Sequence, residues 1–490
     1  MASNLTRRTF LKSTAALSAF GAWPGFGSGA VSAALAPTPT VRKPGIVRGA
    51  FFYPPADVVL AGECEDNWST HNWFTWPGNQ FKPEEQQKKF MGELQRIVDG
   101  LALELIMDDA PIYTDAAINA FIAEIETDTP DALLLFNFWN SFSEKIYPIL
   151  DAFDGPIILY HPVGASHQLP PERFRTDPRL QYIHGIEHYE ALENGLRAVH
   201  ARTRMAHAKL LRVSSRLQEE VTNSDPLFGT PILGVPAAYF NDLFDATEVT
   251  DDIRELAATV RRDALRVTDL SDDAFIDAAC AHAAVLKLMK RHDADAITIE
   301  CLFLKHRKPC LSFALNNGAL VPCGCENDLN ATLSLMLGAY LFGVPGFQHN
   351  PEFDTEDNRY FGAHCTCTPA WRGADAQPAP YELRPFFHQM PKTLALDVKF
   401  PPEEPTTLFK YQQAHGDNKA LLHAWEGRVV SSPDCPPTGG CATRVLVDMD
   451  NVADVCDIYT GPHPALFYGH HARRIKTLAT LYDIDVRSCC

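Results

Sequence analysis

The sequence predicts an α/β protein with two α/β domains followed by a β-rich C-terminal domain. Up to about residue 343, short apolar strand-like runs alternate with amphipathic helix-like stretches. After Pro345, Pro, Gly and Cys become frequent, and strand-like runs replace the helical periodicity. The 490 residues, 46% of them hydrophobic, exceed what one hydrophobic core normally holds. We therefore expect domains at residues 45–172, 173–343 and 344–490.

The first domain is expected to contain a parallel sheet. Residues 82–100 (KPEEQQKKFMGELQRIVDG) begin with Pro and acids, carry apolar residues at helical spacing and end in Gly, which predicts a helix. Strand-like runs surround it: GIVRGAFFY, LELIMDD, ALLLFNFWNS and PIILYHP. Buried strands that alternate with helices are typical of βαβ units, in which ligands bind at the carboxyl ends of the strands.

The second domain repeats this pattern. AKLLRVSS, TPILGVP and AITIECLFL are strand candidates, and the last one ends near Glu300. Residues 251–267 and 272–292 are amphipathic stretches with acidic starts and basic ends, as the helix dipole favours. An apolar helix, LNATLSLMLGAYLFG, is expected to end at Gly343. Glu300 is a candidate cleft residue because it follows a parallel strand.

The C-terminal domain is expected to be an antiparallel sheet or barrel. TLFKYQQ, KALLHAWEGRVV and TRVLVDMDNVADVCDIY have strand-like patterns. The segment HARRIKTLATLYDI predicts a helix near the end of the chain.

The N-terminus resembles an export signal of the twin-arginine type. TRRTFLK at 6–12 precedes a mildly apolar stretch rich in Ala, Gly and Ser. We expect a signal peptide over residues 1–36, cleaved near Ala33 or Ala36, and a linker over 37–44. An anchoring or core helix is the alternative, but Gly and Pro interrupt the stretch. The protein is thus expected to be exported to the periplasm or beyond, with no membrane span in its mature form.

Charge and motifs argue against nucleic-acid and nucleotide partners. The formal net charge is −18, and the sequence has no dense run of Lys and Arg. A nucleic-acid site needs a basic stripe. Neither a Walker-type loop nor a Gly-x-Gly-x-x-Gly that follows a strand occurs. We expect a small-molecule substrate.

The thirteen cysteines leave several interpretations open. Two Cys-x-Cys pairs occur, Cys323/Cys325 and Cys365/Cys367. They are consistent with a zinc site, although structural zinc sites usually use Cys-x2-Cys. Scattered buried thiols are the simplest interpretation, and disulfides in the last third of the chain are another. An odd number leaves at least one thiol unpaired within the chain.

Residues 323–330, CGCENDLN, place three polar residues before the apolar helix. Asn327 or Asp328 can cap that helix by accepting a bond from its free N–H groups. Glu326 then lies at the positive end of a long buried helix. A carboxylate held there is either part of the helix start or a metal ligand and proton-transferring base.

Two further clusters carry metal-binding side chains. Residues 346–367 offer six candidate oxygen or imidazole donors among their polar residues, whereas residues 460–474 contain His463, His470 and His471. Oxygen donors and imidazoles in a loop-rich segment suit Mn²⁺ or Mg²⁺. A solvated acidic loop and isolated core or surface histidines are the alternatives. The donors of the first cluster are His349, Asn350, Glu352, Asp354, Asp357 and His364.

Two stretches resemble the superfamily of L-fucose isomerase and related sugar isomerases. They are CENDLNATLSLMLGAYLFGVPGF, followed by HCTC, and HPALFYGHHARRIKTLATLYDIDV. The likeness covers residues 290–490 in motifs and only the domain order before them. It implies two Rossmann-like α/β domains, a C-terminal barrel-like domain and a homo-oligomer. Members of the family without the export signal are cytoplasmic.

The resemblance also implies a divalent ion, most commonly Mn²⁺. Its ligands would be Glu326, His463 and an acidic residue at the position of Asn350. An amide can coordinate a hard cation but cannot accept a proton, so the sequence departs from the family there. Either Asn350 keeps the ligand role alone, or Glu352 or His364 replaces the acid. This departure argues against assuming that the substrate is fucose.

The expected activity is aldose–ketose isomerisation of a monosaccharide. A metal that chelates both substrate oxygens stabilises a cis-enediolate, and a carboxylate carries the proton between carbons. Glu326 and Asn350 are the catalytic candidates, and Glu326, Asn350 and His463 are the metal candidates. Glu300, His364 and His470 are candidates for substrate binding. A non-catalytic carbohydrate-binding protein is the alternative, and a redox or zinc protein is a third hypothesis.

Overall fold

The computed structural model is a mixed α/β protein with parallel and mixed sheets and a β-rich region. It describes residues 8–12, 32–65, 82–138, 144–162, 169–386, 391–416, 419–434 and 441–488. The chain divides into two compact units. Unit 1 comprises Met1–Ala16, Lys43–Arg204 and Lys476–Ile484, and unit 2 comprises Leu17–Arg42, Met205–Ile475 and Asp485–Cys490.

Unit 1 is built on a six-stranded sheet in the order β1-β3-β2-β4-β5-β6. Its strands are β1 (Arg8–Lys12), β2 (Gly45–Phe52), β3 (Leu103–Asp108), β4 (Ala132–Asn137), β5 (Ile157–Pro162) and β6 (Leu180–Gly185). All but β1 are parallel, as the alternating pattern predicts. Because β6 pairs with β5, this sheet extends past residue 172.

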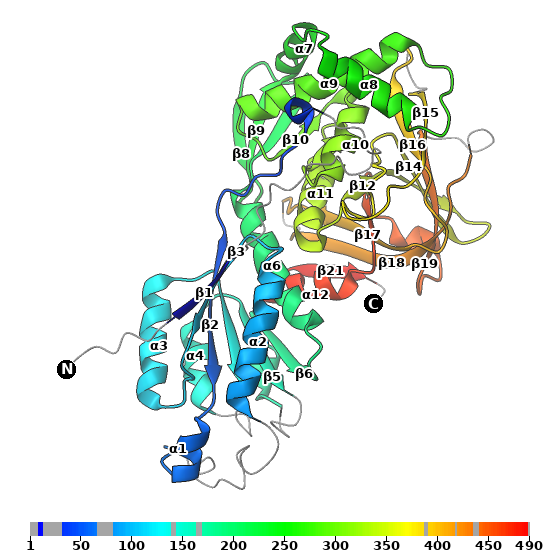
Figure 1. Cartoon of the computed structure of the whole chain (residues 1–490). Helices are drawn as coiled ribbons and strands as arrows, with labels where there is room; N and C mark the ends of the chain where they lie inside the picture. The colour runs from blue at the N-terminus through cyan, green and yellow to red at the C-terminus, as the bar shows by residue number, and fades with distance from the viewer. Residues whose placement is uncertain are drawn as a thin grey trace. The chain divides into compact units, whose positions relative to one another are not determined.

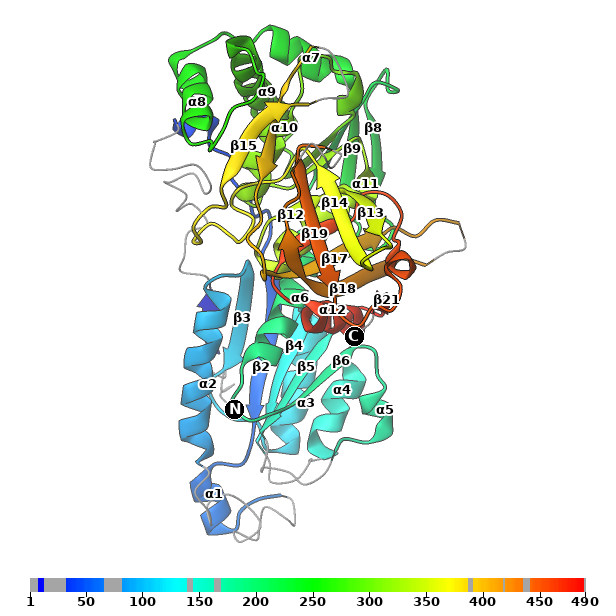
Figure 2. The ribbon, with the colours of Figure 1, turned by 90° about the vertical axis from the view of Figure 1, so that its right-hand side faces the viewer.

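Helices flank this sheet (Figures 1 and 2). They are α1 (Ala56–Ala61), α2 (Pro83–Val98), α3 (Asp115–Asp128), α4 (Tyr147–Ala152), α5 (Glu172–Arg175) and α6 (Glu190–His207), with a short 3-10 turn at Glu144–Ile146. The predicted helix over 82–100 is present as α2, with Pro83 at its start and acids in its first turn.

Part of the expected signal peptide forms strand β1. This strand pairs antiparallel with β3, and Thr9 Oγ1 donates a hydrogen bond to Asp109 Oδ1 at 2.6 Å. Residues 1–7 and 13–31 of the expected signal lie outside the described residues. Arg8 pairs with Asp108 in this register, and its Nη2 lies 2.6 Å from Glu124 Oε2, so it has a structural role at the edge of the sheet.

Unit 2 contains a five-stranded sheet in the order β11-β10-β7-β9-β8. Its strands are β7 (Leu210–Ser214), β8 (Val221–Ser224), β9 (Pro231–Pro236), β10 (Ala296–Ile299) and β11 (Cys323–Cys325). All but β8 are parallel. The accompanying helices are α7 (Ala237–Asp245), α8 (Asp251–Arg262), α9 (Asp272–Arg291), α10 (Cys310–Gly318) and α11 (Leu329–Phe342), with 3-10 turns at Ala33–Leu35 and Cys301–Phe303.

An antiparallel sheet makes up most of the β-rich region of unit 2. It runs in the order β12-β20-β17-β18-β19-β14-β13, with β21 added in parallel to β18. Its strands are β12 (Gly346–Gln348), β13 (Asn350–Asp354), β14 (Arg359–His364), β17 (Pro405–Gln412), β18 (Leu421–Ser431), β19 (Thr443–Met449), β20 (Ala465–Tyr468) and β21 (Asp485–Ser488). A separate hairpin joins β15 (Tyr381–Pro385) to β16 (Leu394–Val398). A 3-10 turn at Val455–Ile458 and helix α12 (Ala472–Leu481) complete the described elements.

Helix α11 connects the parallel and the antiparallel sheets of unit 2. It contacts β10 and β11 of the first sheet and β12, β17 and β20 of the second. Nearly all of its residues are buried, which explains why its sequence is apolar on every side. Gly338 lets it approach Phe467, because a Cβ there would overlap that ring. Gly343, in the left-handed conformation at φ 75°, ends the helix as predicted.

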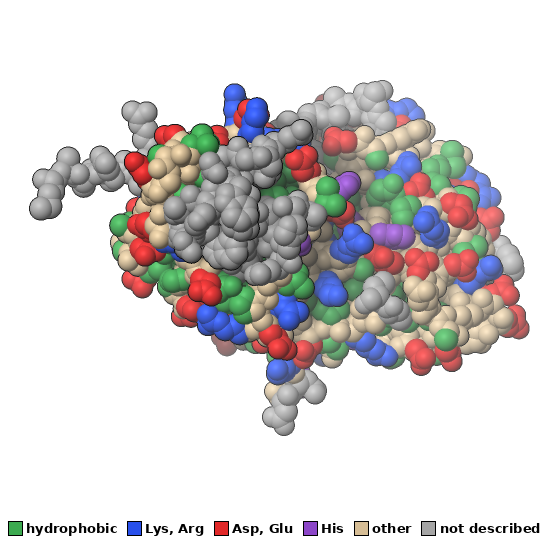
Figure 3. All heavy atoms as spheres, turned by 90° about the horizontal axis from the view of Figure 1, so that it is seen from below, with side chains coloured by type: hydrophobic (Ala, Val, Ile, Leu, Met, Phe, Trp, Pro, Cys, Tyr) green, Lys and Arg blue, Asp and Glu red, His purple; other side chains and the backbone are tan. Residues whose placement is uncertain are grey.

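Surface charge and helix apolarity are the features that bear on possible partners. On the face seen in Figure 3, acidic and basic side chains are interspersed among the described residues rather than separated by sign. None of the described helices is long and apolar enough to cross a membrane.

Candidate metal centre

The loop between β11 and α11 is held by a close approach of the two elements. A Cβ on Gly324 would overlap the side chain of Thr332, so only glycine allows β11 to lie this close to the first turns of α11. Glu326 and Asn327 follow with φ of 61° and 60°, a conformation that is costly for residues other than glycine.

Asp328 is the N-cap of α11. Its Oδ1 accepts a hydrogen bond from the backbone N–H of Ala331 at 2.9 Å. The capping interpretation of this loop is therefore correct, but it applies to Asp328 and leaves Glu326 without a role in the helix.

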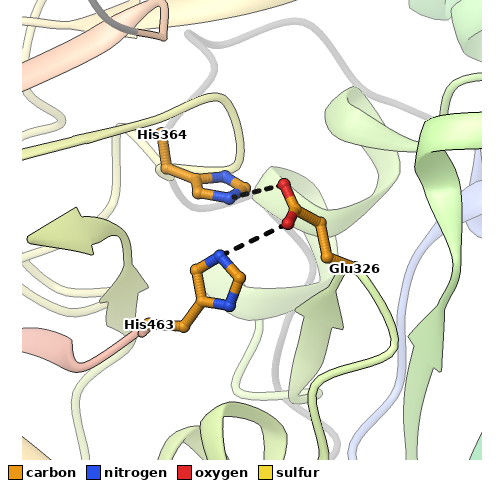
Figure 4. A group of neighbouring side chains, drawn as sticks. All are labelled: Glu326, His364 and His463. Carbon is orange, nitrogen blue, oxygen red and sulfur yellow. Dashed lines mark ion pairs between the residues drawn. The ribbon is translucent and has the colours of Figure 1, made fainter. Parts of the chain in front are cut away.

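Two imidazoles face the carboxylate of Glu326 (Figure 4). His364 Nε2 lies 3.6 Å from Glu326 Oε1, and His463 Nε2 lies 3.5 Å from Glu326 Oε2. Among the described residues, these three are the group whose ligand atoms all lie within 4.8 Å of one another. The side chain of Glu326 is 28% exposed, whereas those of the histidines are 1% and 8% exposed. The centre is thus accessible from the carboxylate side.

The two histidines come from the antiparallel sheet. His364 is the last residue of β14, where it pairs with Thr443 of β19. His463 precedes β20 and, at φ 54°, is another non-glycine residue in the left-handed region. Backbone strain on both sides of the centre is typical of functional sites, where the surrounding fold maintains it.

The distances fit a shared cation better than direct hydrogen bonds. A good N–H···O bond spans about 2.7–3.2 Å, so 3.5 and 3.6 Å are too long. Ligand atoms that each lie about 2.0–2.2 Å from one ion are separated by more than 3 Å. Both Nε2 atoms are buried and have no hydrogen-bond partner among the described residues. Buried polar nitrogens of this kind need a partner, and a divalent cation would provide it.

Asp328 also orients His463. Its Oδ2 lies 3.0 Å from His463 Nδ1. A carboxylate on the far nitrogen of a histidine fixes the tautomer that leaves Nε2 as a ligand. Lys410 supports this pair from the antiparallel sheet, since its buried ammonium donates to the carbonyl of Pro462, the residue before His463.

The centre favours an ionised carboxylate. The imidazole of His364 lowers the pKa of Glu326 below its usual value, and this effect outweighs the burial that raises it. Burial disfavours the charged form of His364, but Glu326 and the neighbouring thiols outweigh it, so the pKa of His364 is raised. Burial also acts to raise the pKa of Asp328, but its bonds to His463 and the Ala331 N–H outweigh that effect and lower it.

Asn350 stays a predicted ligand, because its strand pairs with the strand that carries His364. Asn350 is the first residue of β13, paired with Ala363 next to His364, and Glu352 on the same strand is exposed. Of the two substitutes considered for the missing acid, His364 therefore joins the centre and Glu352 does not. His470 Nε2 lies 3.3 Å from the carbonyl oxygen of Gly427, outside the cluster.

Glu300 lies at the same edge of the parallel sheet as Glu326. It follows β10, the strand next to β11. One carboxylate oxygen accepts hydrogen bonds from Ser214 Oγ at 2.8 Å and from Ser215 N and Oγ at 2.8 and 2.9 Å. Arg216 lies 3.6 Å from the other oxygen. Glu300 is thus a fixed, buried carboxylate at the carboxyl end of a parallel strand.

Sequence reasoning missed the second role of Asp328. The residue was a capping candidate, and one side chain with two carboxylate oxygens can satisfy two donors. The spacing of Asp328 and Glu326 places both beside the same helix start. Their common partner lies 135 positions from Asp328, so no local pattern could have identified it.

No family model matches the chain, and the curated proteins include no significant match.

Proposed function

We propose that the protein is a metal-dependent aldose–ketose isomerase that acts on a monosaccharide. The observation that carries the proposal is the convergence of Glu326, His364 and His463, with two buried imidazole nitrogens directed at one carboxylate. Mn²⁺ is the ion we favour, because the resemblance to sugar isomerases implies it and a carboxylate oxygen suits it. When bound, such an ion would supply positive charge next to the two oxygens of an open-chain sugar.

The protein's own residues then have distinct tasks. Glu326 is held ionised and partly exposed, so it is both a ligand and the group that faces the substrate. His364 and His463 are buried ligands, and Asp328 keeps His463 in the correct tautomer. Glu300, fixed by Ser214 and Ser215, offers an acceptor for a sugar hydroxyl at the neighbouring strand end.

A non-catalytic carbohydrate-binding protein is the second candidate. It is favoured by Asn350, which cannot accept a proton, and by the lowered pKa of Glu326, which makes that carboxylate a weak base. In this case the centre would hold an ion and a sugar without moving a proton between carbons.

We extend the proposal to fold family and location. The two parallel sheets and the antiparallel sheet support two Rossmann-like domains and a barrel-like domain of the L-fucose isomerase type. We also propose a homo-oligomer and export by the twin-arginine route. Sequencing the N-terminus of the secreted form would test the export. Cleavage near Ala33 or Ala36 would give a mature chain that lacks β1, whereas a secreted chain that still begins before Arg8 would contradict the cleavage.

The deciding experiment measures proton exchange in deuterated water. The purified protein, loaded with Mn²⁺, would be incubated with a panel of aldoses and ketoses, and deuterium at C1 and C2 would be followed by NMR. An isomerase incorporates deuterium and forms the second sugar. A binding protein shifts sugar signals without exchange, and a protein that does neither contradicts both candidates.

A matched pair of variants connects this result to the centre. Glu326→Gln removes a ligand charge and should weaken Mn²⁺ binding at least about 100-fold, beyond the 10–100-fold typical of an outer-shell change. Glu352→Gln changes the same chemical group on an exposed strand position and should bind like the parent. If both variants bind Mn²⁺ equally well, Glu326 is not a ligand of the ion.

A further inference from the structure

Five buried cysteines lie around the centre. Cys301 Sγ is 3.0 Å from Cys325 Sγ, and Cys310 Sγ is 3.6 Å from Cys365 Sγ. Cys441 is buried close to His364 and Cys365. Each close pair contains the neighbour of a centre residue, because Cys325 precedes Glu326 and Cys365 follows His364. The two Cys-x-Cys motifs thus contribute one thiol each to separate pairs.

The first pair is unusually close. Non-bonded carbon atoms already rest about 3.5–4.0 Å apart, and sulfur is larger. A disulfide bond spans about 2.05 Å, so the two sulfur atoms need to approach by only about 1 Å. Cys325 is the last residue of β11, and Cys301 begins the 3-10 turn two residues after β10, the strand paired with β11 in the parallel sheet.

Buried side chains fix the backbone on both sides of this pair. Lys308 Nζ donates to the carbonyls of Cys301 and Leu302 at 2.7 and 3.0 Å. Gln348 accepts from the N–H of Cys325 at 2.8 Å and donates to its carbonyl at 3.2 Å. The backbone positions of Cys301 and Cys325 are therefore fixed by the fold, and these positions keep the two thiols close together.

We propose that Cys301 and Cys325 are a disulfide-forming pair that braces the loop of Glu326. Each thiol loses its hydrogen as the Sγ–Sγ bond forms, and the two electrons and two protons reduce a disulfide reagent to two thiols. The bond ties the end of β10 to the residue before Glu326, whose backbone is strained at φ 61°. A braced loop loses less conformational freedom when the centre binds a cation, so the oxidised protein binds more tightly. This second effect rests on the proposed function.

The test is a mass measurement on the full-length protein. The protein is incubated with oxidised glutathione, its remaining thiols are alkylated, and its peptides are mapped. We expect a cross-linked peptide that joins Cys301 to Cys325 and disappears on reduction. The Cys325→Ser variant lacks it, while Cys280→Ser, a change at a buried cysteine of α9, keeps it.

Burial of both thiols can by itself prevent their reaction with oxidised glutathione. The incubation is therefore repeated in a denaturant concentration below the unfolding transition, where local opening exposes the thiols to the reagent. Recovery of Cys301 and Cys325 as separate alkylated residues under both conditions would overturn the proposal. A cross-link between Cys310 and Cys365 alone would overturn it as well, because the closer pair should react first.

Mn²⁺ titration of the oxidised protein and of Cys325→Ser tests the bracing. We expect the oxidised protein to bind at least about threefold more tightly. Equal Mn²⁺ affinity of the two proteins would show that the disulfide does not brace the loop of Glu326, although the disulfide itself would still be supported by the mass measurement. If neither form binds Mn²⁺, the proposed metal centre fails, and the mass result still decides whether the disulfide exists.

Discussion

The two parallel sheets place carboxylates at the ends of their strands, but among the described residues the cluster of metal-binding side chains lies at the edge in unit 2. In unit 1, β3 ends at Asp108, whose Oδ1 lies 2.6 Å from the guanidinium of Arg48. In unit 2, β11 is followed by Glu326, which faces two imidazoles at 3.5 and 3.6 Å. The carboxylate of Asp108 has a guanidinium at hydrogen-bond distance, whereas that of Glu326 faces two unpartnered Nε2 atoms with room for a cation.

The difference lies in what the rest of the chain brings to the edge. Arg48 comes from β2, the strand next to Asp108 in the same sheet. His364 and His463 come from a second sheet that packs on the same core as β10 and β11. A strand-end carboxylate therefore becomes a candidate site when a different layer supplies complementary ligands. Its position at the strand end is not enough.

The largest expected change in stability tests whether Asp108 of unit 1 serves to stabilise the fold through its pair with Arg48. Arg48→Met should cost about 3–5 kcal/mol in the free energy of unfolding, because it leaves a buried carboxylate without its partner. Urea denaturation of the full chain measures it. Arg254→Met, at an exposed position of α8, should change stability by less than about 0.5 kcal/mol. A cost for Arg48→Met no larger than that of the control would mean that Asp108 does not depend on this pair.

The next effect tests the outer partner of the metal centre. Asp328→Asn keeps an oxygen that can cap α11 but removes the charge opposite His463 Nδ1. We expect Mn²⁺ to bind about 10–100-fold more weakly, with little loss of helix stability. Calorimetric titration gives the affinity, and thermal unfolding of the metal-free protein gives the stability. Unchanged affinity would show that Asp328 is only a cap.

A third change tests the close approach that positions Glu326. Gly324→Ala adds a methyl group that overlaps Thr332, and we expect a loss of about 1–3 kcal/mol in stability. Gly92→Ala is the matched control, because a Cβ at that helical position meets no atom within 4 Å. It should stabilise the protein by about 0.5–1 kcal/mol. If Gly324→Ala is as stable as the parent, the glycine is not needed for the turn.

The smallest effect concerns acid stability. Burial lowers the pKa of His282 and of His423 to about 4 in the folded protein. The unfolded chain takes up these protons near pH 6.5, so stability falls as the pH drops from about 6.5 towards 4. Each histidine should contribute about 1 kcal/mol of this loss between pH 6.5 and 5.5.

Urea midpoints measured across that pH range give the slope. His423→Gln should make the slope shallower, since glutamine does not titrate. A stability that stays constant from pH 6.5 to 5.5 would contradict the neutral, buried state of these side chains.

Sequence patterns were most informative where the signal is local. The apolar runs that became β2, β3, β4 and β5 follow directly from period and burial, and so does α11, which is apolar on all sides and ends at Gly343. The position of Asp328 before α11 also followed from capping chemistry.

The candidate site was only partly accessible to such reasoning. Glu326 and His463 were identified by resemblance, whereas His364 was one of several donors in its segment. Asn350 was expected to be a ligand and stays a prediction, while the cluster that the structure brings together has His364 beside Glu326 and His463. Which donor of a loop-rich segment reaches the centre depends on the pairing of β13, β14 and β19, and sequence spacing does not encode that register.

The position of His463 has a consequence for how the protein is made. β20, which follows it, is an interior strand between β12 and β17. A growing chain cannot complete this sheet until these residues have left the ribosome. Until then it also lacks His463, the third residue of the candidate centre. Contacts between such distant segments form slowly. The candidate centre should therefore be assembled only after residue 463 has been added, and chains stopped before residue 460 should neither bind manganese nor resist proteases in unit 2.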